Sequence, residues 1–226
     1  MPRKLEHDLS DLKDRVLKMG SLVEDAIRKS IKALVERDQD LALAVIDGDA
    51  VVNTHDVEIE EECIRLLAIW QPTGSNLRFI TTAIKIITDL ERMGDMAVDI
   101  CERAVELLDE PQLKPYIDIP RMAEASQKML KDSLDAFVEK NPDLAMTVCE
   151  ADDFVDNLNH QIFNELLVYM LQDPKNIARA VRLTYVAKYL ERIGDHATNI
   201  AEMVVYMVKG KVIRHMACEV REPGKR

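Results

Sequence analysis

The sequence predicts an all-α protein made of two tandem three-helix bundles, and three observations support this fold class. Long segments carry apolar residues at the alternating spacing of three and four that marks one face of a helix. Only 7 glycines and 8 prolines occur in 226 residues, and the prolines fall in breaks between these segments. The stretch LERMGDMAVDI at 90–100 returns as LERIGDHATNI at 190–200, with seven of eleven positions identical.

The breaks carry the residues that start helices. RDQDLA offers Asp38 as an N-cap, and its counterpart NPDLA offers Asn141 as an N-cap with Pro142 as the first helical residue. Pro72 and Pro174 lie in corresponding breaks of the two halves. No segment alternates apolar and polar residues as a strand would. We therefore expect helices at 5–37, 40–70, 76–110, 119–140, 142–172 and 174–209.

The two halves align throughout, which sets the domain organisation. DLALAVIDGDAVVN at 40–53 matches DLAMTVCEADDFVD at 143–156, and the densest break, DEPQLKPYIDIP, lies between the halves. The sequence thus predicts one three-helix repeat over residues 1–110 and a second over 119–209. The remaining tail, 210–226, is basic and lacks a clean period, so we expect a frayed end there.

Composition excludes several classes of function. The formal net charge is −11 and aromatic residues make up only 4%, which disfavours nucleic-acid binding. No apolar run approaches the roughly 18 to 20 residues that span a bilayer, and the basic start has no apolar segment behind it. We expect a cytoplasmic protein whose scattered cysteines stay reduced: Cys63, Cys101, Cys149 and Cys218.

The repeated motif places acidic side chains on one helix face. Glu91, Asp95 and Asp99 follow one another at intervals of four, so they advance 40° per step along roughly 12 Å of helix. They lie at the flank of the buried stripe through Leu90 and on the outer side of the helix. The preceding helix carries a similar row, each member of which follows an apolar position by one residue.

The second half repeats this arrangement, and we name the two groups by half. The first acidic set contains Asp49, Asn53, Glu91, Asp95 and Asp99, with Asp56 as a neighbour. The second acidic set contains Asp152, Asp156, Glu191, Asp195 and Asn199. Like charges at this spacing repel by a few tenths of a kcal/mol per pair. A bound cation would relieve that repulsion at an oxygen-rich site, which suits Mg, Mn, Ca or iron ahead of Zn.

Two other interpretations of the acidic sets stay open. An acidic face on a helix is often merely solvated, and a repeat preserves patterns by ancestry alone. However, the neighbouring surface differs between the halves (Met96 against His196, Val98 against Thr198) while the acids and amides persist. Asn199 stands where the first half has Asp99, and a neutral amide is a weaker ligand, so the two sites are expected to differ.

Residues around the motif have structural interpretations. His196 lies about 100° from Asp195 and points away from the acids, so a surface or capping histidine is favoured, and His55 falls on an apolar stripe. Gly94 and Gly194 lie on their buried stripes, where glycine costs roughly 1 kcal/mol against alanine, which indicates close approach of helices. Arg92 and Arg192 are expected to pair with neighbouring acids across the bundle.

Motifs of catalysis are missing from the sequence. It contains no Gly-rich phosphate loop, no G-x-S-x-G, no H-E-x-x-H and no E-x-x-H pair of the kind that di-iron bundles use. We therefore predict that the protein is not an enzyme.

Two three-helix units that close on DLERMGDMAVDI and YLERIGDHATNI, each with an upstream D-x-x-V-[ND], resemble the PhoU family of accessory regulators of phosphate-specific transport. The resemblance covers almost the whole chain. It implies a helical regulator that restrains the phosphate-starvation response at the cytoplasmic face of the membrane. The implied partners are the ATPase subunit of the phosphate transporter, a sensor histidine kinase and a second copy of the chain.

The family resemblance also implies metal clusters bound through E/D-x-x-x-D motifs, which here are the ten residues of the two acidic sets. The identity of the metal, among Fe, Mg, Mn, Ca and Zn, stays open. An alternative from another class is a helical-bundle metalloprotein for metal storage or metal-dependent chemistry. The lack of histidine ligands and of an enclosed polar core argues against that alternative.

Overall fold

The computed structural model describes residues 2–212, and in this range every long element is an α-helix. The helices are α1 (Pro2–Glu36), α2 (Gln39–Trp70), α3 (Gly74–Glu106), α4 (Asp118–Glu139), α5 (Pro142–Gln172) and α6 (Ile177–Lys209), with a short 3-10 helix η1 (Pro174–Asn176) before α6. No strand occurs in the described part. The all-α fold with two three-helix repeats is confirmed; most of the tail predicted at 210–226 lies outside the described residues.

The helix starts follow the capping residues that the sequence offers. The Asp38 carboxylate accepts a hydrogen bond from the Leu41 amide at 2.9 Å, and the Asn141 side chain accepts from the amides of Asp143 and Leu144 at 3.1 Å. The predicted helix at 76–110 was too long, because α3 ends at Glu106 and the chain turns there. The helix predicted from 174 begins as η1, since the Asp173 carboxylate caps that turn.

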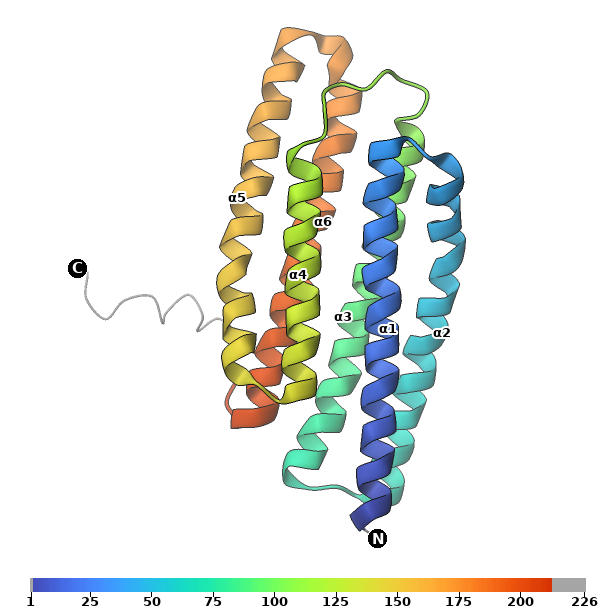
Figure 1. Ribbon diagram of the computed structural model, residues 1–226, viewed down its shortest axis with the longest axis vertical. Helices are drawn as coiled ribbons and strands as arrows, with labels where there is room; N and C mark the ends of the chain where they lie inside the picture. Colours follow the sequence, from blue (N-terminus) through green and yellow to red (C-terminus); the bar gives the residue numbers. More distant parts are fainter. Residues whose placement is uncertain (1, 213–226) are drawn as a thin grey trace, which may run out of the picture.

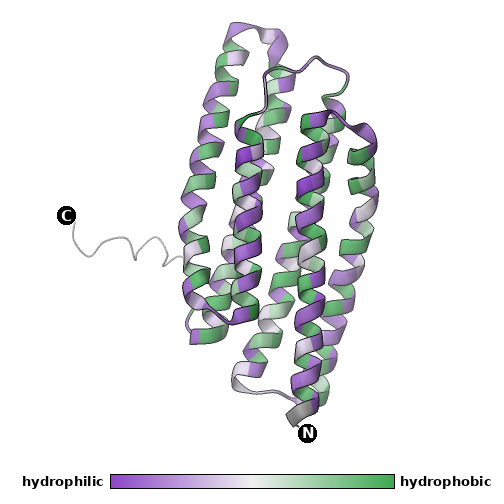
Figure 2. Ribbon diagram, viewed as in Figure 1, coloured by the Kyte–Doolittle hydropathy of each residue, from purple (hydrophilic) through white to green (hydrophobic). Residues whose placement is uncertain are grey.

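The two repeats run in opposite directions and pack side by side (Figure 1). α1 and α3 of the first repeat contact α4 and α6 of the second, with α3 and α6 antiparallel in the middle. α2 and α5 lie at the outer edges, each against the last helix of its own repeat. One hydrophobic core runs through both repeats, so their interface is continuous with the interior of each bundle. Figure 2 shows hydrophobic residues on the helix faces turned toward neighbours and hydrophilic ones outside.

Specific contacts fix the register between neighbouring helices. The rings of Phe79 on α3 and Phe137 on α4 stack with centroids 5.1 Å apart. The buried Ser126 hydroxyl on α4 donates to the carbonyl oxygen of Leu190 at 3.0 Å within its own repeat. These polar and aromatic contacts join helices whose other buried residues are aliphatic, and they therefore limit sliding of one helix along another.

The connection between the repeats, residues 107–117, is tied down at several points. One Arg37 nitrogen donates to the carbonyl oxygens of Leu107, Leu108 and Glu110, at 3.1, 2.7 and 2.8 Å. The buried Lys114 ammonium pairs with Glu165 on α5. The loop is thereby attached to the end of α1 and to the second repeat, and three of its backbone carbonyl oxygens accept hydrogen bonds although it lacks regular structure.

Three of the four cysteines fall in the described residues, and all three are free thiols. Cys63 and Cys101 are buried and Cys149 is partly buried. Burial raises the pKa of Cys63 and Cys101 to about 12 and that of Cys149 to about 11, so none is a reactive thiolate at neutral pH. This agrees with the predicted packing role; Cys218 lies outside the described residues.

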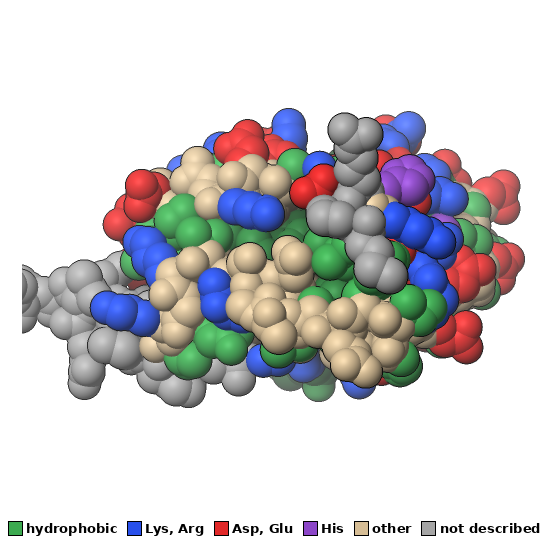
Figure 3. Space-filling model, turned by 90° about the horizontal axis from the view of Figure 1, so that it is seen from below, with side chains coloured by type: hydrophobic (Ala, Val, Ile, Leu, Met, Phe, Trp, Pro, Cys, Tyr) green, Lys and Arg blue, Asp and Glu red, His purple; other side chains and the backbone are tan. Residues whose placement is uncertain are grey.

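The described helices contain no membrane span, and one end of the molecule carries charges of both signs. None of its helices combines the length and the apolar character needed to cross a bilayer. Viewed from the end where α1 begins (Figure 3), acidic and basic side chains are scattered around the rim, with hydrophobic side chains between them. That end therefore offers a mixed surface, and the acidic sets lie elsewhere, along the helices.

A pair of glycines tests the contact between the repeats. A methyl group at Gly20 on α1 would overlap the Leu134 side chain of α4, whereas nothing lies within 4 Å of a methyl group at Gly48 on α2. We expect Gly20→Ala to lower the free energy of unfolding by about 1–3 kcal/mol through overpacking. Gly48→Ala should raise it by up to about 1 kcal/mol through helix propensity. Urea denaturation of both variants checks this, and equal effects would contradict the close packing of α1 against α4.

Candidate functional site

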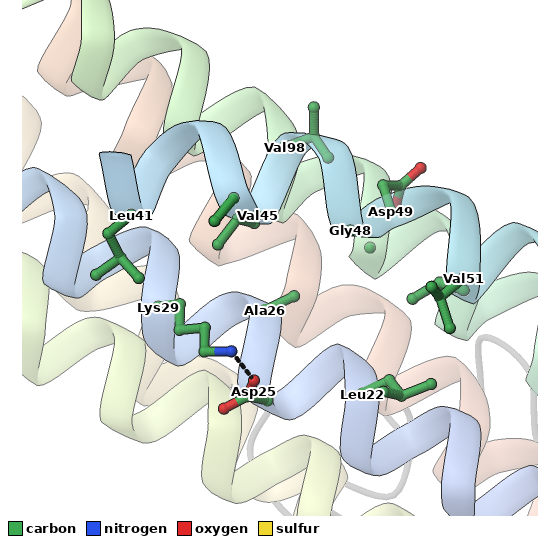
Figure 4. Close-up of a pocket in the computed structure, with 13 residues that line it drawn as sticks. Leu22, Asp25, Ala26, Lys29, Leu41, Val45, Gly48, Asp49, Val51 and Val98 are labelled. Atoms are coloured by element: carbon green, nitrogen blue, oxygen red, sulfur yellow. Dashed lines mark ion pairs between the residues drawn. The ribbon is translucent and has the colours of Figure 1, made fainter. Parts of the chain in front are cut away.

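The two acidic sets lie where the second and third helices of each repeat pack together. Asp49 on α2 reaches the backbone of α3 at Gly94, because a Cβ built at Gly94 would lie 3.2 Å from its Oδ1. The same Cβ would lie 3.3 Å from the Val52 side chain, so the predicted close approach at Gly94 is confirmed. In Figure 4, Asp49 points away from the ion pair of Asp25 and Lys29 on α1. Its carboxylate is thus directed to the α2–α3 side of the bundle.

In the first set, carboxylates from both helices raise one another's pKa. Burial is the largest cause of the raised pKa of Glu91, followed by the charges of Asp95, Asp56 and Asp49. Burial also raises the pKa of Asp49, with a further contribution from Asp95, while a hydrogen bond from Asn53 at 2.7 Å acts in the opposite direction. The structure therefore brings acids of α2 and α3 into one electrostatic group, as the sequence predicted.

The second set forms the equivalent group between α5 and α6. Burial raises the pKa of Asp152 to about 6, and the charges of Asp156, Asp195 and Glu191 add to the shift. Burial likewise raises the pKa of Asp195 and of Asp156, and the negative charge of Glu191 raises both pKa values further. The Oδ1 atom of Asp152 is buried and accepts no hydrogen bond. A buried carboxylate oxygen without a donor is the strongest sign in either set of a missing positive partner.

The two sets differ in where their neutral amide lies. Each contains four carboxylates and one amide, but the amide is Asn53 on α2 in the first set and Asn199 on α6 in the second. Asn53 donates to Asp49, whereas the equivalent Asp156 has no proton to donate to Asp152. The two sets therefore carry equal numbers of carboxylates, but Asp152 in the second set lacks the amide donor that Asp49 has in the first. The repulsion among the carboxylates is accordingly less offset in the second set.

The structure does not bring all ten predicted residues equally close. Asp99 lies one turn along α3 from Asp95, and its pKa is raised by burial, then by Glu102 and to a lesser degree by Asp95, while Arg103 and Arg192 lower it. Among the described residues, no three His, Cys, Asp or Glu side chains converge as a preformed metal site. Basic side chains already pair with the sets: Arg92 with Glu91 at 3.4 Å and Asp95 at 3.5 Å, and Lys188 with Glu191.

The surrounding residues corrected two expectations from the sequence. The prediction of a surface or capping histidine at 196 was wrong, because its Nδ1 lies 2.7 Å from Asp89 Oδ1 of α3 in a largely buried contact between the repeats. Arg92 pairs with acids of its own helix and not across the bundle. Arg192 of α6, in contrast, lowers the pKa of Asp99 on α3 through its positive charge, as an interaction across the bundle would. The contacts of His196 with Asp89 and of Arg192 with Asp99 depend on the antiparallel packing of α3 against α6, which periodicity within one helix does not reveal.

Histidine 55 and the second glycine match their predictions more closely. The His55 side chain is only 16% exposed and lies 3.7 Å from Glu58 on its own helix. A Cβ built at Gly194 would lie 3.5 Å from Asp152 Oδ1 and from the Val155 side chain, which is ordinary van der Waals contact. The α5–α6 approach is therefore slightly looser than the α2–α3 approach, although the residue pattern is the same.

Fold and site together define a class of all-helical proteins with two antiparallel repeats, each bearing an acidic face. The PhoU domain matches the chain twice, over residues 16–104 and 119–204. The PhoU homolog of Aquifex aeolicus, named a phosphate-specific transport system accessory protein, is 44% identical over 98% of this chain and 100% of its own length. The accessory protein PhoU of Escherichia coli K12 is 36% identical over 92% of this chain and 87% of its own.

Solved structures agree with this assignment. The crystal structure of PhoU from Pseudomonas aeruginosa superposes with a TM-score of 0.87 at 39% identity, covering 91% of this chain and 99% of that one. The phosphate transport system regulatory protein PhoU from Streptococcus pneumoniae gives a TM-score of 0.85 at 29% identity, covering 92% and 98%. The chain belongs to the PhoU family.

The pKa of Asp152 leads to a prediction for the metal-free protein. The folded state raises the pKa of Asp152, so folding favours the protonated form of this side chain. The contribution of that protonated form to the free energy of unfolding is complete near pH 4, and it is lost as the pH rises through about 6. At pH 7, Asp152→Asn should therefore raise the free energy of unfolding by about 1–2 kcal/mol, after allowance for solvent screening. The gain should vanish near pH 4. Urea denaturation across this pH range checks it.

Asp49→Asn is the matched control for this prediction. Asn53 already donates to Asp49, so the neutral side chain should bring a smaller gain at pH 7. If the two substitutions raise the free energy of unfolding equally at pH 7, the buried oxygen of Asp152 without a donor has no special effect on stability.

Proposed function

We propose that the protein is a non-enzymatic, negative regulator of the phosphate-starvation response. In this proposal it couples the ATPase subunit of the high-affinity phosphate transporter to a sensor histidine kinase at the cytoplasmic face of the membrane, and it acts as a homodimer. The observation that carries the proposal is membership of the PhoU family over nearly the whole chain. Relatives of similar length are named accessory proteins of phosphate-specific transport, which supports a role in regulating that transport.

The two acidic sets are proposed to bind divalent or ferric cations. The chemistry of the donors fits, because each set offers four carboxylates and an amide oxygen, and Asp152 carries a buried oxygen without a donor. The ligands would come from Asp49, Asn53, Glu91, Asp95 and Asp99 in the first repeat and from Asp152, Asp156, Glu191, Asp195 and Asn199 in the second. A bound cation supplies positive charge that offsets the mutual repulsion of these carboxylates.

The protein's own residues determine what such binding does. Side chains of α2 and α3, or of α5 and α6, must turn toward one another, because they do not converge in the structure described. Arg92 and Lys188 must release the acids with which they pair. Binding would therefore hold the second helix of each repeat against the third. The carboxylates of each acidic set, which repel one another without a cation, would become fixed in position, and the net negative charge of that face would fall.

Metal binding is tested on the purified protein by thermal unfolding and by metal analysis. Fe, Mn, Mg, Ca and Zn are added separately after chelation, and a bound metal at 100 times its dissociation constant should raise the stability by about 2.7 kcal/mol. The variant Glu91→Gln, Asp95→Asn, Glu191→Gln and Asp195→Asn should lose this response. A control that neutralises four exposed acids elsewhere, Glu6, Glu61, Glu124 and Glu150, should keep it. If the wild-type protein retains no metal and its thermal stability does not change when metals are added, the acidic sets are solvated faces and not metal sites.

The regulatory role is tested in the host. Deletion of the gene should make alkaline phosphatase output constitutive in phosphate-rich medium, and the wild-type gene should restore silence. The four-residue acidic variant should fail to restore it if the acidic sets act in signalling, provided that it accumulates as a folded protein. If deletion leaves the output unchanged, the proposed regulation is wrong for this host. The alternative of a metal-storage or metal-dependent helical bundle would then be favoured, provided that the purified protein binds metal.

A further inference from the structure

A groove lies between α4 and α5, the first two helices of the second repeat. Its volume is about 450 Å³, and we name it the α4–α5 groove. Its walls include Ala125 and Met129 of α4 with Thr147, Val148, Ala151 and Phe154 of α5. Met129 and Val148 are buried, whereas the Phe154 ring is 44% exposed. The second repeat thus leaves a largely apolar surface open between these two helices.

The charge of α5 is of one sign. Pro142–Gln172 contains six acidic residues and neither lysine nor arginine. Two of the acids, Asp143 and Glu150, are exposed and lie within about 60° of Thr147 and Phe154 around the helix axis. A basic segment with apolar side chains would therefore meet negative charge and apolar surface on the same face of α5.

Basic residues from other parts of the chain already pair with α5 near both of its ends. Lys114, in the connection between the repeats, pairs with Glu165. Lys209, the last residue of α6, places its Nζ 4.0 Å from Asp143 Oδ1 near the start of α5. Gly210, in the left-handed conformation, ends α6 at this point. The chain beyond α6 therefore begins at the face of α5 that borders the groove.

Residues 210–226 have a composition complementary to this face. They contain five basic and two acidic residues, whereas the whole chain carries a net charge of −11. The larger apolar residues Ile213, Met216 and Val220 lie among these charges. The sequence alone predicts a frayed end here, but the end of α6 lies beside a surface of opposite charge with an apolar groove. That surface supplies the partner that the sequence does not reveal.

The length of the chain beyond the described residues suits the groove. Asp143 and Phe154 are eleven residues apart, which is about 16 Å along α5. The fourteen residues 213–226 would span about 21 Å as a helix and about 48 Å when extended, so either form covers that distance. A short tether gives an effective concentration in the millimolar range. Even a contact with a dissociation constant of about 0.1 mM would then be formed about nine-tenths of the time.

The first repeat provides a matched control. Its equivalent groove, between α1 and α2, is drawn in Figure 4. An offset of 103 residues places Asp40 and Asp47 where α5 has Asp143 and Glu150, so the charges beside the two grooves are alike. The turn between α1 and α2, however, lies at the opposite end of the molecule from the end of α6 (Figure 1). The tether therefore selects the groove of the second repeat.

We propose that residues 213–226 dock in the α4–α5 groove of their own chain, with basic side chains against the acids of α5 and apolar side chains in the groove. Docking would cover the exposed ring of Phe154 and bring positive charge to a helix that has none of its own. This inference depends neither on the role in phosphate regulation nor on cation binding by the acidic sets.

Cross-linking of the full-length chain tests the docking. Cys218 lies within the docking segment, and Thr147→Cys places a second thiol at the groove. Cys149→Ser removes the partly buried thiol of α5 from all samples. A short bis-maleimide should then link the two thiols within one chain. The yield of this link should be at least about ten times that obtained with Ala44→Cys, the equivalent position of the first repeat.

Charge reversal gives a second, independent measurement. Arg214→Glu with Arg221→Glu lies outside every described helix, so it tests the segment without altering the bundle. It should lower the yield of the link at Thr147→Cys by about tenfold or more, because like charges would meet on α5. Asp143→Lys with Glu150→Lys should lower it similarly, for the same reason.

The matched control for the groove variant is Asp40→Lys with Asp47→Lys, which should leave the yield unchanged. The proposal is overturned if Thr147→Cys and Ala44→Cys give equal yields, or if charge reversal in the segment has no effect. An equal loss in the matched control would also overturn it. So would links that form only between chains, since the segment would then occupy the groove of another copy. None of these measurements involves alkaline phosphatase output, which decides the regulatory role separately.

Discussion

The antiparallel packing of α3 against α6 is the contact on which the rest of the structure depends. It joins the two repeats into one core, so that the apolar inner faces of the two bundles cover each other. It also places the last helix of each repeat at the centre, where its inner side is buried and its outer flank is left for the second helix of the same repeat. The acidic sets lie on that flank in both repeats, and their equivalent positions follow from this shared geometry.

Most of the fold could be predicted from the sequence because each helix carries its own period and its own start signal. Asp38 and Asn141 marked two starts correctly, and the repeat itself divided the chain into units of three helices. The end of α3 could not be placed, because Leu107 and Leu108 continue the apolar period after the helix has ended. Beyond Glu106 the chain is held by tertiary contacts, including three carbonyl oxygens that accept hydrogen bonds from Arg37, and no local pattern records these contacts.

The acidic sets were predicted from spacing within single helices, and the structure joined the rows across helices as that spacing indicated. Contacts between the repeats were not predictable in this way. The pairing of His196 with Asp89 links residues 107 positions apart, and it depends on the register of α3 against α6. Likewise, Asp156 stands where the first repeat has Asn53, so Asp152 lacks the amide donor that Asp49 has. The aligned repeats contain that difference, but its effect appears only when burial is known.

The tied loop between the repeats has a mechanical consequence. A loose connection would allow the two bundles to open and close like the arms of a hinge. Here the loop is held by Arg37 from the first repeat and by the Lys114–Glu165 pair from the second, over a core that is already continuous. Movement of one bundle relative to the other would have to break these contacts and expose part of the shared core, so the two repeats are held together as one rigid body.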